Sequence, residues 1–131
     1  MWKVLLIGAF GGAGAILRYL VSSCSVHWFG SGFPLGTLIV NVAGCFLLGL
    51  LYEVTETTEL VSSEWRHGLG VGFLGGLTTF STFGYETHHQ LHSSLWRHAA
   101  ANVTLNVALG LLAVWVGISV AKLVVSPMIV R

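Results

Sequence analysis

The chain carries a run of small, hydroxyl-bearing and aromatic residues inside a stretch that hydropathy otherwise predicts to cross a membrane. This run extends from Gly72 to Thr87 and reads GFLGGLTTFSTFGYET. Glycine lets the backbone leave the helical conformation, and irregular backbone at membrane depth is stable only inside protein or beside a polar cavity. A helix that only faced lipid would not need this combination of residues. The run therefore predicts part of a permeation path or an ion site.

Within this run, Phe80 and Phe83 are three residues apart and share one face of a predicted helix, with Ser81 and Thr82 between them. An aromatic pair in a membrane helix usually serves packing. The edge of an aromatic ring is electropositive, however, so ring edges beside hydroxyl and amide donors can hold a small dry anion without a fixed positive charge. Conduction also requires binding that is weak enough for the ion to leave. This pattern favours an anion pathway.

Three asparagines fall inside predicted membrane spans. Asn41 lies in the second span, and Asn102 and Asn106 lie four residues apart on one face of the fourth. A buried amide needs partners, because each unsatisfied polar group in hydrocarbon costs several kcal/mol. One interpretation is hydrogen bonding between helices, worth about 0.6–2 kcal/mol per bond. The other is that their N–H groups line an anion route, and the neighbouring hydroxyl run favours it.

Ionisable side chains are scarce in the predicted spans. Arg18 lies near the end of the first span, where it either extends its guanidinium to the membrane interface or sets a positive potential at a vestibule. No acidic residue falls inside a span. Proton-coupled transporters usually place a carboxylate or histidine within the membrane, so this absence argues against an antiporter.

Four histidines gather in and beside the third predicted connection, and two of them have the i, i+4 spacing of one helix turn. They are His88, His89, His92 and His98. Neither cysteine nor aspartate accompanies them, and the connection is expected to be exposed. We interpret them as solvated loop residues, with a metal site as the alternative.

The composition places these residues in an integral membrane protein. Of 131 residues, 54% are hydrophobic and only 8% are charged, against roughly 25% charged in soluble proteins. A spanning helix needs roughly 20 mainly apolar residues. The sequence predicts four such spans, at about 4–22, 35–52, 68–85 and 99–125. Residues 1–131 then form a single four-helix transmembrane domain, although a cleaved signal peptide ending near Ala15 is an alternative for the first span.

Four spans place both termini and the connection 53–67 on one side of the membrane. Orientation follows the excess of lysine and arginine near helix ends, and here the excess is weak. One side holds Lys3, Arg66, Lys122 and Arg131, and the other holds Arg97 and Arg18. Either orientation, or a mixture of both, is compatible with this bias. A net charge of +1 gives no reason to expect a nucleic-acid partner.

Glycines at four-residue spacing predict close helix packing. They form the pair Gly8 and Gly12 and the series Gly68, Gly72 and Gly76. Helices in lipid associate through such close backbone approach, and the spacing does not tell contacts within a subunit from contacts between subunits. Four thin helices can hardly enclose a polar path, so we expect a homo-oligomer, most simply a dimer.

The chain resembles the small fluoride-specific ion channels (Fluc, also called CrcB) along essentially its whole length. The most specific match is the third-span string Thr78-Thr79-Phe80-Ser81-Thr82-Phe83, preceded by Gly72-Phe73 and Gly75-Gly76. The other spans contribute Gly11-Gly12, Gly14-Ala15, Arg18-Tyr19, Gly36-Thr37-Leu38, Asn41, Gly44, Phe46, Gly49, Asn102, Asn106 and Gly110.

The resemblance implies an all-α integral membrane protein whose third helix is broken mid-membrane and which assembles as an antiparallel, dual-topology homodimer. It implies a passive channel rather than an enzyme, exporting toxic fluoride from the cytoplasm across the cell inner or plasma membrane. The rings of Phe80 and Phe83 and the amide of Asn41 would contact fluoride, and Ser81 and Thr82 would extend the polar track.

The resemblance also implies a structural sodium ion at the dimer centre, held by the backbone carbonyls of Gly75 and Thr78. A carbonyl cage suits a hard cation. Two other functions stay open from the residues alone: a small multidrug-type proton-coupled antiporter, and a non-transporting tetraspan that only assembles with partners. Composition and spacing by themselves lead to a small-anion pathway in an oligomeric four-helix membrane protein, and fluoride rests on the resemblance.

Overall fold

The computed structural model describes residues 1–58 and 60–129, with side chains described as far as Ser126. Within them the chain folds into three long helices and one composite segment. The long helices are α1 (Trp2–Phe29), α2 (Leu35–Thr57) and α6 (Trp96–Ile129). The composite segment consists of α3 (Ser63–His67), the π-helical η1 (Gly68–Leu74), α4 (Gly75–Leu77) and α5 (Phe80–His92).

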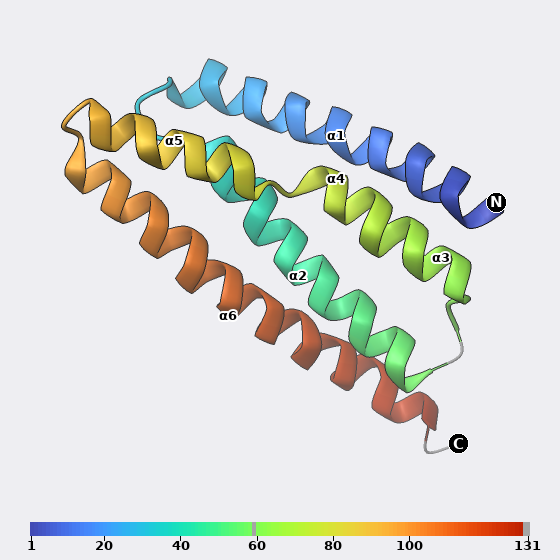
Figure 1. Ribbon diagram of the computed structural model, residues 1–131. Helices are drawn as coiled ribbons and strands as arrows, with labels where there is room; N and C mark the ends of the chain where they lie inside the picture. Colours follow the sequence, from blue (N-terminus) through green and yellow to red (C-terminus); the bar gives the residue numbers. More distant parts are fainter. Residues whose placement is uncertain (59, 130–131) are drawn as a thin grey trace.

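These four parts run side by side in alternating directions (Figure 1). The N-terminus, the α2–α3 connection and the C-terminal end of α6 lie at the same end of the molecule, as the four-span prediction requires. By length and composition, α1, α2 and residues Trp96–Ser126 of α6 could each cross a membrane. The predicted third span, 68–85, lies instead over η1, α4 and α5.

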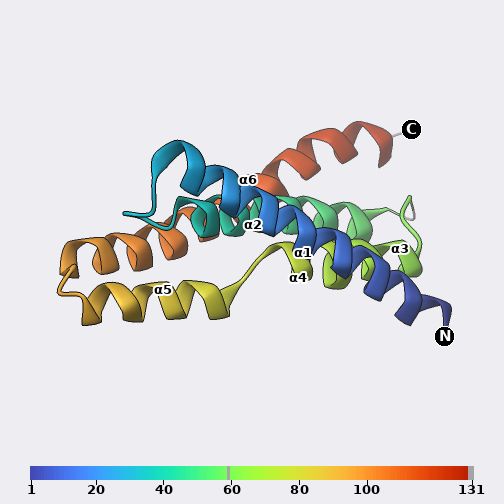
Figure 2. The same ribbon diagram turned by 90° about the horizontal axis from the view of Figure 1, so that it is seen from above.

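Thr78 and Thr79 separate α4 from α5. Both residues have extended backbone, with ψ angles of 158° at Thr78 and 117° at Thr79. Figure 2 shows that α5 leaves the direction of α4 beyond this point and lies away from α1. Its packing is instead against α6, with a smaller contact on α2. The two threonines therefore decide where the second half of the composite segment goes.

The helices are longer than hydropathy predicts, and this corrects the position of the histidines. The predicted connection 86–98 was wrong: α5 continues to His92, so His88, His89 and His92 lie on a helix. Hydropathy reports burial in lipid and not helix length, and no proline or glycine interrupts the polar residues after Gly84. The helix ends where Ser94 takes a positive φ of 60°.

Close approach at glycine holds α1 against the composite segment. A β carbon at Gly76 would overlap the Gly11 carbonyl of α1, and one at Gly14 would overlap the Phe73 carbonyl. At Gly72 it would lie 2.8 Å from the carbonyl oxygen of Ile7. Such contacts let backbones touch and add dispersion and weak polar attraction where lipid supplies no hydrophobic force. The predicted close packing is thus confirmed within the chain for Gly72 and Gly76.

Close backbone approach at glycine also joins α2 to α6. A β carbon at Gly49 would overlap the Val114 carbonyl, and one at Gly117 would overlap the Phe46 carbonyl. By contrast, β carbons at Gly8 and Gly12 would meet nothing within 4 Å. This face of α1 is therefore open in the single chain.

Candidate ion site between α2, α4, α5 and α6

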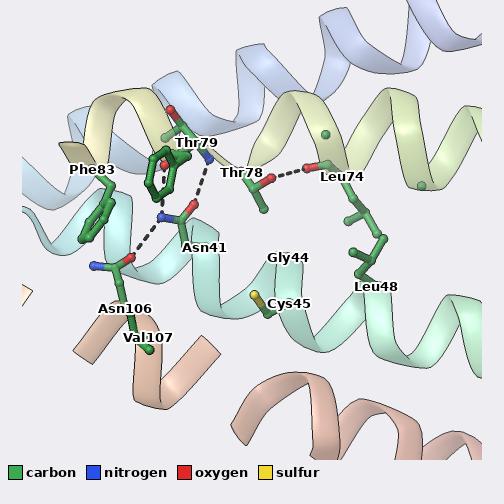
Figure 3. A pocket seen from close by; sticks show the side chains of 13 residues that line it. Asn41, Gly44, Cys45, Leu48, Leu74, Thr78, Thr79, Phe83, Asn106 and Val107 are labelled. Carbon is green, nitrogen blue, oxygen red and sulfur yellow. Dashed lines mark hydrogen bonds between the residues drawn. The ribbon is translucent and has the colours of Figure 1, made fainter. Parts of the chain in front are cut away.

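The side chain of Asn41, on α2, binds the backbone that links α4 to α5. Its Oδ1 accepts a hydrogen bond from the Thr79 N–H at 2.8 Å, and its Nδ2 donates to the Thr79 carbonyl at 3.2 Å (Figure 3). A buried peptide group in extended conformation has no helical partners and must find others. One primary amide supplies both a donor and an acceptor, which makes asparagine well suited to this position.

The hydroxyl groups of the threonine string complete the two helix ends. Thr79 is the N-cap of α5, and its Oγ1 accepts from the Thr82 N–H at 3.1 Å. The Thr79 hydroxyl also donates to Thr82 Oγ1 at 3.0 Å and lies 3.3 Å from Ser81 Oγ. On the other side, Thr78 Oγ1 donates to the Leu74 carbonyl at 2.9 Å, closing the end of α4.

This bonding removes the usual partners of two carbonyls. In a continuous α-helix, the N–H of Thr79 would donate to the Gly75 carbonyl and that of Thr82 to the Thr78 carbonyl. Here the first donates to Asn41 and the second to the Thr79 hydroxyl. The carbonyls of Gly75 and Thr78 therefore lack the amides that a continuous helix supplies, and such groups require another donor or a cation.

A cavity of about 350 Å³ lies beside this link and is open to the surroundings of the single chain. Six of the predicted site residues line it: Asn41, Gly75, Thr78, Phe80, Phe83 and Asn106. The other lining residues are Gly44, Cys45, Leu48, Gly70, Leu74, Thr79 and Val107. None of these described lining residues carries a charged side chain.

The three predicted asparagines form one hydrogen-bonded relay. Asn41 Nδ2 donates to Asn106 Oδ1 at 3.0 Å, and Asn106 Nδ2 donates to Asn102 Oδ1 at 2.9 Å (the first bond is visible in Figure 3). Asn102 Nδ2 in turn donates to Thr87 Oγ1 at 3.0 Å. Asn102 is completely buried and lies behind the cavity wall. The amides therefore join α2, α5 and α6 while exposing Asn41 and Asn106 to the cavity.

The two phenylalanines lie on the α5 side of the cavity. Their ring centroids are 5.6 Å apart at an interplanar angle of 49°. Phe83 is half-buried, whereas Phe80 is 83% exposed. The Phe80 ring therefore lies at the edge of the cavity, with most of its surface uncovered by the single chain.

Other predicted residues lie outside the cavity lining. Ser81 and Thr82 are exposed on the first turn of α5, and Arg18 is half-buried on α1. Among the described residues, the cavity lining does not include these three. Ser81 and Thr82 belong to the site only through their bonds to Thr79.

The structure adds residues to which the sequence analysis gave no role of their own. Thr79 supplies the backbone N–H and carbonyl that Asn41 binds, and its side chain caps α5. Gly44 faces Thr78, whose Cγ2 methyl group lies where a β carbon on Gly44 would be. Thr37 Oγ1 donates to Glu86 Oε1 at 2.9 Å, which joins the start of α2 to α5. Apart from the local cap at Thr79, these contacts connect residues far apart in sequence, so only the hydroxyl-rich composition could have drawn attention to the threonines.

Comparison with known proteins gives consistent matches. The family model described as "CrcB-like protein, Camphor Resistance (CrcB)" matches residues 5–118. A protein of Geobacter metallireducens named fluoride-specific ion channel FluC is 46% identical over 122 residues, covering 93% of this chain and 98% of the relative. A protein of the same name from Alteromonas mediterranea is 51% identical over 116 residues, covering 88% and 91%. The similarity thus includes the whole of the site described above.

Proposed function

The chain belongs to the CrcB family, and from this premise we propose that it is a passive fluoride channel that releases fluoride from the cytoplasm. The observation that carries the proposal is the uncharged cavity in which the Asn41 amide lies beside Phe80 and Phe83. The matching relatives are named fluoride-specific ion channels. The membrane crossed is the cell inner or plasma membrane.

Fluoride binds through hydrogen-bond donors and ring edges rather than through a fixed positive charge. Both protons of Asn41 Nδ2 have partners in the single chain, the Thr79 carbonyl and Asn106 Oδ1. The bond to the Thr79 carbonyl holds the backbone between α4 and α5 in place, so the bond to Asn106 is the one that fluoride replaces. Because an amide dipole binds an anion less tightly than an ammonium group, the ion is also able to leave.

A sodium ion is proposed at the carbonyls of Gly75 and Thr78. Both carbonyls lack their helical amide partners, and both residues line the cavity. Hard cations prefer such oxygen ligands. Two carbonyls are too few for a hard cation, and in this proposal a second copy of the chain supplies further ligands. The sodium ion is structural and is not transported.

The working unit is an antiparallel, dual-topology homodimer, with the Thr78–Thr79 link as the mid-membrane break of the third helix. The high exposure of Phe80 and the open face at Gly8 and Gly12 support a second copy. The weak lysine and arginine bias supports insertion in both orientations. Fluoride then crosses along polar residues from both subunits, with Ser81 and Thr82 as its extension on α5.

The test is efflux from liposomes that contain the purified protein, followed with fluoride and chloride electrodes. We expect rapid fluoride loss with little chloride loss and no need for a proton gradient. Fluoride loss that occurred only with an imposed proton gradient would instead support a proton-coupled antiporter. No loss of either ion from correctly inserted dimers would leave the tetraspan function.

A further inference from the structure

Two histidines on α5 form a pair that the fluoride pathway does not use. His88 and His92 lie one helix turn apart, and both are exposed. Their ring centroids are 6.4 Å apart, and the ring planes are only 15° from parallel. Because both residues lie on a helix rather than in a loop, the backbone already holds the two imidazoles on one face.

We propose that His88 and His92 bind a divalent transition-metal ion, with Zn²⁺ as the reference ion. Histidines at i and i+4 on a helix are a known arrangement for zinc ligation, and imidazole suits zinc, copper and nickel. A zinc–nitrogen bond is about 2.0–2.1 Å long. The exposed rings need only side-chain rotation to bring one nitrogen of each to the same ion.

The remaining coordination positions would be filled by water, because both histidines are exposed in the single chain. The described residues contain no group of three or more histidine, cysteine, aspartate or glutamate side chains placed to share a metal ion. The two histidines are therefore the protein ligands within one chain, and the bound ion exchanges with solution. This distinguishes the site from a closed structural zinc site, which has four protein ligands.

The neighbouring surface of α5 is compatible with such an ion. The opposite side of the helix faces α6, where Thr87 accepts from Asn102, and Gln90 is buried. His89, next along the chain, is paired with Tyr85, with ring centroids 6.3 Å apart. His89 provides a control, because it is a helical histidine next to the pair and has no histidine four residues away. His92 lies three residues from it, so replacing His89 also tests whether the i, i+4 pair rather than the i, i+3 pair binds the ion.

The test is isothermal titration of Zn²⁺ into full-length protein without a polyhistidine tag, in detergent and freed of metal with EDTA. We expect saturable binding of one Zn²⁺ per chain. His88→Gln and His92→Gln should each abolish it over the same concentration range, and His89→Gln should retain it. Equal binding in all four proteins, or none in the unaltered protein, would overturn the proposal.

A second measurement identifies the ligands directly. Bound Cu²⁺ in the unaltered protein should show electron paramagnetic resonance couplings to two imidazole nitrogens, and either substitution should leave at most one. Unfolding temperatures measured without metal check that the variants are folded. Neither measurement depends on fluoride transport, so a protein that binds Zn²⁺ but conducts no fluoride would overturn the proposed function alone.

Discussion

The Oδ1 atom of Asn41 lies 2.8 Å from the backbone nitrogen of Thr79, a residue 38 positions later, and the Nδ2 atom of the same side chain lies 3.2 Å from the Thr79 carbonyl. One amide on α2 thus satisfies the peptide groups that lie between α4 and α5. Its Nδ2 also donates to Asn106 Oδ1, and both asparagines line the cavity. Under the proposed function, this single side chain combines structural support with ion recognition.

Replacing Asn41 with alanine should reduce both stability and flux. The Thr79 N–H and carbonyl would lose their partners, and a buried unsatisfied group costs about 1–3 kcal/mol. We expect a lower unfolding temperature in detergent and little fluoride efflux. Ser119→Ala is the control, because its exposed hydroxyl only donates to Trp115 within α6. An Asn41→Ala protein as stable and as conductive as the Ser119→Ala protein would contradict this role.

Replacing Gly44 with alanine should displace the link between α4 and α5. The added β carbon would overlap the Cγ2 methyl of Thr78, and overpacking of this kind costs about 1–3 kcal/mol. Thr78→Ser removes that methyl and keeps the hydroxyl that donates to Leu74. The double variant should therefore recover much of the stability and flux lost in Gly44→Ala, measured by thermal unfolding and fluoride efflux. Equal losses in the single and double variants would show that the overlap is not the cause.

Replacing Phe80 or Phe83 with isoleucine should greatly reduce fluoride efflux while the dimer still assembles. Isoleucine keeps an apolar side chain but has no electropositive ring edge. Phe29→Ile, at the exposed end of α1, is the matched control and should conduct normally. Assembly is checked by light scattering in detergent. Unchanged efflux in both cavity variants would remove the rings from the mechanism.

Withdrawing sodium should weaken the dimer and lower fluoride flux. Carbonyls of Gly75 and Thr78 from two chains would face one another without a cation, and their negative ends would repel. We expect slower efflux and a larger monomer fraction when N-methylglucamine replaces all sodium, with recovery on adding NaCl. Identical flux and assembly throughout would argue against a structural sodium ion.

Hydropathy and residue spacing determined most of the architecture. Long apolar stretches predict α1, α2 and α6, because backbone in lipid must satisfy its own hydrogen bonds. The same reasoning identified the Gly72–Thr87 run as unsuited to lipid, and Asn41, Phe80, Phe83 and Asn106 do meet at one cavity. Helix ends were less predictable, because hydropathy measures preference for lipid and not helix length. The helix α5 continues to His92, beyond the predicted end of the span at residue 85.

The connections between distant residues were decided only by the tertiary structure. Spacing alone does not reveal that Asn41 binds Thr79, that Gly44 faces Thr78, or that Asn102 stands behind Asn106. These contacts depend on the rotation and height at which α2, α5 and α6 pack. For α2 and α6, the close backbone approaches at Gly49 and Gly117 help to set that arrangement. A sequence pattern shows which side chains share a helix face. Which groups on neighbouring helices lie within hydrogen-bonding distance follows only from the packed arrangement.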